Sequence, residues 1–84
     1  MPYRITFKKS VSRDLRRLGK TGADRVLEAL AAELPDAAAS CPELKGKFAG
    51  LRKFRVGDYR VIFAIIGDSV LVTRVGHRRD VYQS

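Results

Sequence analysis

The sequence predicts an α+β domain in which two helices pack on one face of a small, mainly antiparallel sheet. Residues 53–77 contain three apolar, β-branched runs separated by two glycine-containing turns, a pattern typical of consecutive antiparallel strands. Residues 3–8 alternate apolar and polar side chains as a strand does, and residues 11–34 carry apolar side chains at helical spacing. The expected order is therefore β-α-α-β-β-β, with a helical hairpin covering one face of the sheet.

The two helices are predicted from their apolar stripes and from the residues at their ends. Ser10 is the candidate N-cap of the first helix, and Gly19 is its expected stop. A capping box that begins at Thr21 opens the second helix, which we expect to end near Pro35. Residues 43–50 then form an ordered loop in which glycines allow sharp turns.

The register of the last three strands follows from their turns. A two-residue loop at residues 57–58 pairs Arg55 with Arg60. For the second hairpin we expect a three-residue loop over residues 67–69, which pairs Ile62 with Arg74, because a two-residue loop would turn Arg74 into the core. The helix-covered face then carries Phe54, Val56, Tyr59, Val61, Phe63, Ile65, Leu71, Thr73 and Val75. The other face carries Lys53, Arg55, Arg60, Arg74 and, if the alternation continues, Arg78, beside an apolar part made of Ile62, Ala64, Ile66, Val70 and Val72.

The predicted pairing of Arg55 with Arg60 is the feature that points to a ligand. Like charges directly opposite each other destabilise a sheet, and cross-strand pairs matter at about 0.2–1 kcal/mol each. The simplest interpretation is that a multivalent anion binds between the two guanidinium groups. The net charge is +8, and the basic residues gather in residues 1–20 and 45–84, on either side of an acidic stretch. This segregation favours a nucleic-acid ligand over a charge that serves solubility alone.

Composition narrows the class of protein further. Residues 1–84 suffice for one small domain, and no apolar run approaches a membrane span, so we expect a cytoplasmic protein with no membrane partner. Cys41 is the single cysteine and cannot form an internal disulfide, which fits a reducing compartment. We expect no cofactor and no metal, because the acidic residues outside the second helix are mostly in turns and no Cys/His set is present. With His77 as the single histidine, phosphodiester chemistry is left to Lys, Arg, Tyr and that residue.

Three segments of the chain resemble a known superfamily. Leu44-Lys45-Gly46, the string LRKFRVGDYRVIF over residues 51–63 and the string VGHRRDVY over residues 75–82 are similar to the RelE/ParE superfamily of type II toxin–antitoxin toxins. The resemblance covers nearly the whole chain and implies the RelE-like toxin fold. RelE-like members are ribosome-dependent endoribonucleases that cut mRNA, whereas ParE-like members share the fold, poison DNA gyrase and generally lack the catalytic set.

On the RelE-like branch, the resemblance implies a catalytic set on the last strands. The predicted catalytic residues are Arg60, Arg78, Tyr82, Lys53, Arg55 and His77. Arg60 and Arg78 would hold the scissile phosphate, and Tyr82 would orient a group or donate a proton. One of the family's two strand lysines falls on Leu51 here, which makes Arg55 and His77 candidates beside Lys53 for activating the 2′-hydroxyl. Further RNA contacts are expected from Arg13, Arg16, Arg17, Lys20, Lys45, Lys47, Arg52, Arg74 and Arg79.

The resemblance also implies a protein partner. A cognate, RelB-like antitoxin would form a hetero-oligomer with this chain, cover its basic face and keep it from the ribosome and mRNA. The predicted antitoxin contacts are Ile62, Ala64, Val72 and Arg74, although a loop of the chain itself is an alternative cover for these apolar residues. Two other functions stay open, a gyrase poison without nuclease activity and a plain nucleic-acid-binding domain. Retention of Arg60, Arg78 and Tyr82 favours the nuclease.

Overall fold

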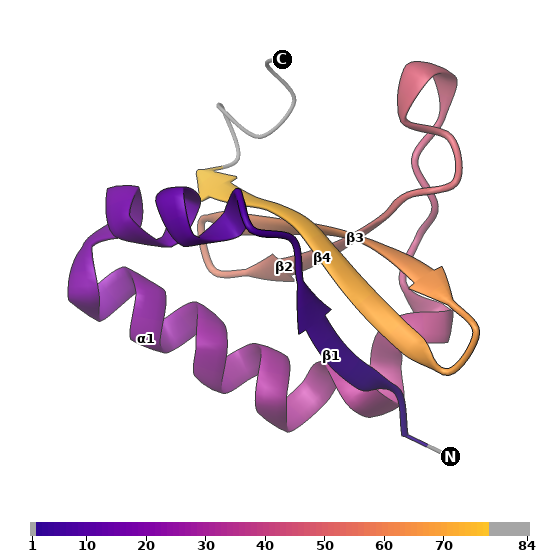
Figure 1. Cartoon of the computed structure of the whole chain (residues 1–84), viewed down its shortest axis with the longest axis horizontal. Helices are drawn as coiled ribbons and strands as arrows, with labels where there is room; N and C mark the ends of the chain where they lie inside the picture. Colours follow the sequence, from indigo (N-terminus) through magenta and orange to yellow (C-terminus); the bar gives the residue numbers. More distant parts are fainter. Residues whose placement is uncertain (1, 78–84) are drawn as a thin grey trace.

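Four strands form one mixed sheet, and a long helix packs against one of its faces (Figure 1). The computed structural model describes residues 2–77. Their elements are β1 (Arg4–Phe7), α1 (Val11–Ala37), the short 3-10 helices η1 (Ala38–Ser40) and η2 (Gly46–Phe48), β2 (Arg52–Val56), β3 (Tyr59–Ile66) and β4 (Ser69–His77). The strand order is β1-β4-β3-β2, with β1 parallel to β4 and the other pairs antiparallel. The predicted fold class is confirmed.

The predicted helical hairpin corresponds to α1, which is broken at Gly19. The φ of 77° and ψ of 169° at this residue are not helical, and Figure 1 shows the chain reversing its direction between the two helical parts. Ser10 occupies the predicted N-cap position before Val11, but its backbone is already helical and its side chain makes no cap hydrogen bond. The helix also runs to Ala37, two residues beyond Pro35, since a proline in the last turn removes only one helical hydrogen bond.

The core lies between α1 and the sheet. Its largest fully buried side chains are Phe63, Leu30, Leu34, Val11, Val26, Val61, Val70 and Val72. Tyr3 and Ile5 of the β1 region and Leu15 and Leu18 of α1 pack against this cluster from its edges. Within residues 2–77, no helix is both long enough and apolar enough to cross a bilayer.

The second hairpin differs from the prediction at its turn. Ile66 pairs with Ser69, so the loop has two residues, and a β-bulge lies farther along the strands. Phe63 pairs with Val72 while Ile62 pairs with Arg74, which leaves Thr73 as the extra residue of β4. The predicted pairing of Ile62 with Arg74 is therefore confirmed, and the three-residue loop that we expected is wrong.

The bulge also changes the faces of the turn-side half of β4. Val70 and Val72 are fully buried in the core, although the sequence placed them on the other face. Leu71 and Thr73, which we expected in the core, are half-buried and lie outside the core cluster. One inserted residue reverses the alternation, because side chains in a strand point to opposite faces in turn.

Candidate nucleic-acid interface

The sheet face that points away from α1, called the outer face below, carries the predicted cations in two adjacent rows. Arg55 pairs with Arg60, which pairs with Gly76 on β4. In the next row, Lys53 pairs with Ile62, which pairs with Arg74. Alternate residues of a strand share a face, so Lys53, Arg55, Arg60 and Arg74 lie on the same face. Four positive side chains from three strands are thereby brought to one end of the sheet.

The Arg55–Arg60 row sits next to a tight turn that fixes it. Gly57 has a φ of 57°, and Asp58 is not among the residues with positive φ, which is the signature of a type II′ turn. The Nε of Arg55 donates a hydrogen bond of 3.1 Å to the carbonyl oxygen of Gly57. Arg55 is exposed and Arg60 is half-buried, so both reach solvent. The like-charged pair that the sequence predicted is thus present in the register.

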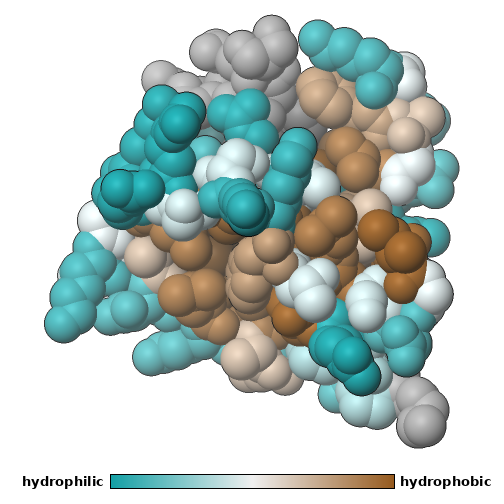
Figure 2. Space-filling view, in the orientation of Figure 1, coloured by the Kyte–Doolittle hydropathy of each residue, from teal (hydrophilic) through white to brown (hydrophobic). Residues whose placement is uncertain are grey.

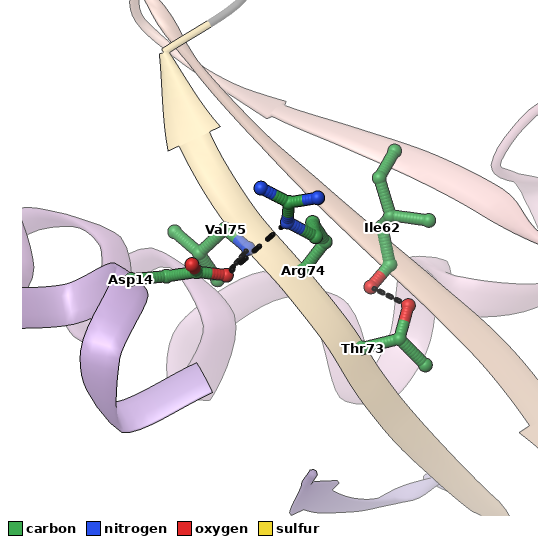
Figure 3. A network of polar contacts seen from close by, with 5 residues as sticks. All are labelled: Asp14, Ile62, Thr73, Arg74 and Val75. Carbon is green, nitrogen blue, oxygen red and sulfur yellow. Dashed lines mark hydrogen bonds and ion pairs between the residues drawn. The ribbon is translucent and has the colours of Figure 1, made fainter. Parts of the chain in front are cut away.

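Arg74 is held by a carboxylate that the sequence reasoning missed. The Oδ2 of Asp14 lies 3.7 Å from the Nε of Arg74 and accepts the backbone N–H of Val75 at 3.0 Å (Figure 3). Asp14 is 8% exposed, and among residues 2–77 it is the one charged residue that is buried. Its burial could have been predicted from its position, because Asp14 falls within the apolar stripe of α1, three residues after the buried Val11.

His77 lies on the other face from the arginines. It pairs with Tyr59, and the two rings meet edge to face with centroids 6.4 Å apart and an interplanar angle of 89°. Tyr59 packs against the core and over Gly22 of α1, where an added Cβ would lie 2.9 Å from the tyrosine oxygen. The structure therefore does not bring His77 together with Arg60, because residues 59 and 60 point to opposite faces. Arg78, Arg79 and Tyr82 lie outside the described residues.

Comparison with known proteins identifies the family. The family model described as the ParE toxin of the type II toxin–antitoxin system parDE matches residues 5–82. This chain belongs to that toxin family. The predicted membership of the RelE/ParE superfamily is confirmed. No curated protein sequence matches the toxin with significance.

Solved structures of toxins share its fold. The RelBE2 toxin–antitoxin complex of Mycobacterium tuberculosis matches with 28% identity and a TM-score of 0.86, over 93% of this chain and 100% of that one. The archaeal RelE–RelB complex of Pyrococcus horikoshii matches with 28% identity and a TM-score of 0.66, over 96% and 100% of the two chains. An Escherichia coli RelE double arginine-to-alanine mutant, bound to an antitoxin RelBc peptide, matches with 25% identity and a TM-score of 0.69, over 92% and 84%.

The other predicted RNA contacts of the toxin fall into three places. Arg13, Arg16, Arg17 and Lys20 are exposed around the first part of α1, and Lys45 and Lys47 are exposed in the loop around η2. Arg52 differs, because its partner Phe63 places it on the helix-covered face. Its Nη1 donates to the carbonyl oxygens of Cys41 at 2.7 Å and Ala39 at 3.3 Å. Arg52 thus ties β2 to η1, and its guanidinium does not join the outer-face cations.

Two of the predicted antitoxin contacts, Val72 and Ile62, are buried in the structure. Val72 is fully buried in the core and cannot line an open face. Ile62 lies on the outer face but is only 3% exposed, while Ala64 and its pairing partner Leu71 are half-buried. A more open apolar surface lies across β1, β4 and α1 in Figure 2, and a groove of about 510 Å³ there is lined by Phe7, Lys8, Lys9, Val11, Ser12, Leu15 and Leu27.

Cys41 is the remaining group with intrinsic reactivity. It is buried, and burial raises the pKa of its thiol, while the positive charge of Arg52 opposes this shift. Its thiol lies 3.4 Å from the carbonyl oxygen of Ala37. A thiol with a raised pKa is a poor nucleophile, so Cys41 acts as a small packing residue. Residues 2–77 contain no group of three His, Cys, Asp or Glu side chains placed to hold a metal.

Proposed function

We propose that this toxin is a ribosome-dependent, metal-independent endoribonuclease that cleaves mRNA. The observation that carries the proposal is the in-register pair of Arg55 and Arg60, with Lys53 and Arg74 in the next row of the same face. A sheet gains nothing from opposing like charges unless an anion sits between them. A phosphodiester satisfies such a pair with two charge-assisted contacts, and guanidinium groups are the side chains best suited to that geometry.

The chemistry uses a nucleophile that RNA itself supplies. The 2′-hydroxyl attacks the adjacent phosphorus, the bond to the 5′-oxygen breaks, and the products are a 2′,3′-cyclic phosphate and a 5′-hydroxyl. Arg60 and, by resemblance, Arg78 bind the non-bridging oxygens and stabilise the charge that develops on them. Lys53 or Arg55 assists removal of the 2′-proton, and Tyr82 supplies the proton to the leaving oxygen. We favour Lys53 and Arg55 over His77 for this step, because His77 lies on the other face with Tyr59.

The test is primer extension on a message translated in a purified cell-free system. Wild-type toxin should produce cuts within the translated frame and none in the same RNA without ribosomes. The new 5′ ends should accept a label from polynucleotide kinase without prior dephosphorylation, because they carry hydroxyl groups. Arg60→Ala should fold and lose at least about 100-fold in cleavage rate, while the exposed Arg25→Ala should lose less than about threefold. The proposal would be overturned if the toxin arrested the growth of cells that express it while translated mRNA stayed intact.

A second candidate function is a DNA gyrase poison, which the match to the ParE family model favours. It requires no catalytic set, so Arg60→Ala should remain toxic. Purified gyrase and supercoiled plasmid provide the assay. Toxin-dependent linear DNA after denaturation, together with intact mRNA in the cell-free system, would establish this function in place of the nuclease.

The proposed partner is a RelB-like antitoxin in a hetero-oligomer. The toxins of M. tuberculosis, P. horikoshii and E. coli described above are each seen in complex with an antitoxin or an antitoxin peptide. On the outer face we retain Ala64 and Arg74 as contacts, and Leu71 takes the position that we predicted for Val72. Co-expression with the neighbouring reading frame should yield a stable complex. Leu71→Asp should weaken that complex, and Asp36→Asn on α1 should not.

A further inference from the structure

We propose that Asp14 is a positioning residue that holds Arg74 on the outer face as a phosphate-binding side chain. The inference rests on the proposed function for its ligand, RNA. Asp14 itself touches no ligand in this proposal, since it is buried. Its role is to fix both the backbone beside Arg74 and the guanidinium group, through the two contacts of its Oδ2.

The first contact completes the edge of β4 where β1 ends. The last pair of β1 with β4 is Phe7 with Val72, and the N–H of Lys8 still donates to the carbonyl oxygen of Val72 at 2.9 Å. Beyond this point α1 covers the edge, and Asp14 accepts the N–H of Val75 at 3.0 Å. A side-chain carboxylate thus provides the acceptor that a longer β1 would have provided. A buried carboxylate is stable only when it is hydrogen-bonded and paired, and here both conditions are met.

The second contact acts on a segment that is already reshaped by the bulge. Thr73 is the extra residue, and its Oγ1 donates to the carbonyl oxygen of Ile62 at 3.2 Å on the β3 side. Asp14 holds the opposite side at Val75 (Figure 3). Arg74 lies between these two anchors. Bulges re-aim single side chains near functional sites, and this one turns Arg74 from the core face to the outer face.

The geometry of the ion pair suits a second, anionic ligand. Asp14 lies toward the Nε of Arg74, and Figure 3 shows the two terminal nitrogens on the side of the guanidinium away from the carboxylate. The Arg74 side chain is 38% exposed, so it can be reached from solvent. Terminal guanidinium nitrogens match two oxygens of a phosphate. Arg74 lies one row from the Arg55–Arg60 pair, which places it to bind the same RNA strand.

The substitution Asp14→Asn distinguishes two effects of Asp14 on RNA affinity, the positioning of Arg74 and the repulsion of RNA by its negative charge. Asparagine can still accept the N–H of Val75, but the variant carries one negative charge less, so the net charge rises from +8 to +9. By charge alone, the variant should bind RNA more tightly. If Asp14 positions Arg74, it should bind RNA more weakly. The two accounts therefore predict opposite signs.

The experiment measures binding of a 2′-O-methyl RNA oligonucleotide, which cannot be cleaved, by fluorescence anisotropy. Asp14→Asn should weaken binding by about fivefold to tenfold, which is less than the complete loss of one hydrogen bond to a charged group would cause. Asp24→Asn is the matched control, because it makes the same charge change at an exposed position of α1, and its binding should be unchanged or tighter. In an Arg74→Ala background, Asp14→Asn should cause no further loss. Thermal denaturation confirms that each variant is folded.

The outcomes separate this inference from the proposed function. If Asp14→Asn binds RNA as Asp24→Asn does, or loses as much affinity in the Arg74→Ala background, positioning is overturned whether or not the wild type cleaves mRNA. If the wild type does not bind the free oligonucleotide, the ribosome-dependent cleavage assay still decides the nuclease proposal, and NMR titration with inorganic phosphate decides the inference. Phosphate should then shift the Nε–Hε resonance of Arg74 in the wild type and less in Asp14→Asn. Equal shifts in both proteins would overturn it.

Discussion

Replacing Arg55 by glutamate should abolish RNA cleavage and leave the toxin more stable than replacement by glutamine does. Arg55 and Arg60 are directly opposite on the outer face, so the substitution turns a repulsive pair into an attractive one. Cross-strand pairs are worth about 0.2–1 kcal/mol, and exposed ion pairs lie at the low end of that range. The substitution also removes the hydrogen bond from Arg55 to the carbonyl of Gly57, which offsets about 0.5 kcal/mol at an exposed site.

Arg55→Gln is the reference for the comparison, because it lacks the guanidinium hydrogen bond as Arg55→Glu does and carries no charge. The difference in stability between the two variants therefore reports the charge interaction alone. Arg55→Glu should therefore exceed Arg55→Gln in stability by about 0.5 kcal/mol, which is about 3 °C in melting temperature for a domain of this size. Thermal denaturation in 20 mM and 1 M salt measures the difference. It should shrink at high salt, because salt screens exposed charges.

Activity should follow the reverse order, with the wild type first, Arg55→Gln second and Arg55→Glu last. A carboxylate beside Arg60 would compete with the RNA phosphate for the guanidinium and repel the backbone. Two results would refute the reasoning. The first is an Arg55→Glu protein that is no more stable than Arg55→Gln at low salt, and the second is cleavage at the wild-type rate by Arg55→Glu.

Three further changes test the fold around the site. Gly19→Ala should cost about 2 kcal/mol and about 10 °C in melting temperature, because φ 77° with ψ 169° is nearly closed to other residues; an unchanged melting temperature would contradict this. Gly22→Ala should gain about 1 kcal/mol of helix propensity and lose most of it in pushing Tyr59 aside, so the stability should change little. Because the Tyr59 ring contacts the ring of His77, NMR should show shifted His77 ring signals. The Cys41 thiol, whose pKa burial raises, should react with iodoacetamide at pH 8 more slowly in the folded toxin than in urea. Equal reaction rates in the folded and the urea-unfolded toxin would contradict the burial argument. Because the pKa is raised in the folded state, the free energy of unfolding should include a contribution from the protonated thiol below the usual thiol pKa and should lose it as the pH rises above that value.

The sequence was sufficient wherever short-range chemistry decides the structure. The first hairpin needs only a glycine that accepts positive φ and alternating side chains on both strands, so the pairing of Arg55 with Arg60 was predictable. The break at Gly19 follows from the same property of glycine. The fold class follows from the order of the periodic segments, and resemblance to the toxin superfamily agreed with it.

The sequence was insufficient where a contact joins distant segments. Asp14 and Val75 are 61 residues apart, and the sequence does not indicate which backbone N–H a carboxylate in an apolar stripe will accept. The bulge was missed for a related reason, since a three-residue loop and a two-residue loop with a bulge give the same pairing of Ile62 with Arg74. They differ only in which side chains of the turn-side half of β4 are buried, and that depends on β1 and α1. The position of His77 was missed because it was judged by its neighbours in sequence rather than by its cross-strand partner Tyr59.

The bulge reconciles two demands that one strand cannot meet with regular alternation. The core requires Val70, Val72 and Val75 on the helix-covered face, and these residues are separated by an even and then an odd step. Without an extra residue, burial of Val70 and Val72 would also place Arg74 in the core and Val75 outside. Thr73 removes this conflict at the cost of one irregular position, which the Thr73 and Asp14 hydrogen bonds stabilise. The same irregularity that completes the core is therefore what brings a fourth cation to the outer face, so core packing and ligand binding in β4 depend on one inserted residue.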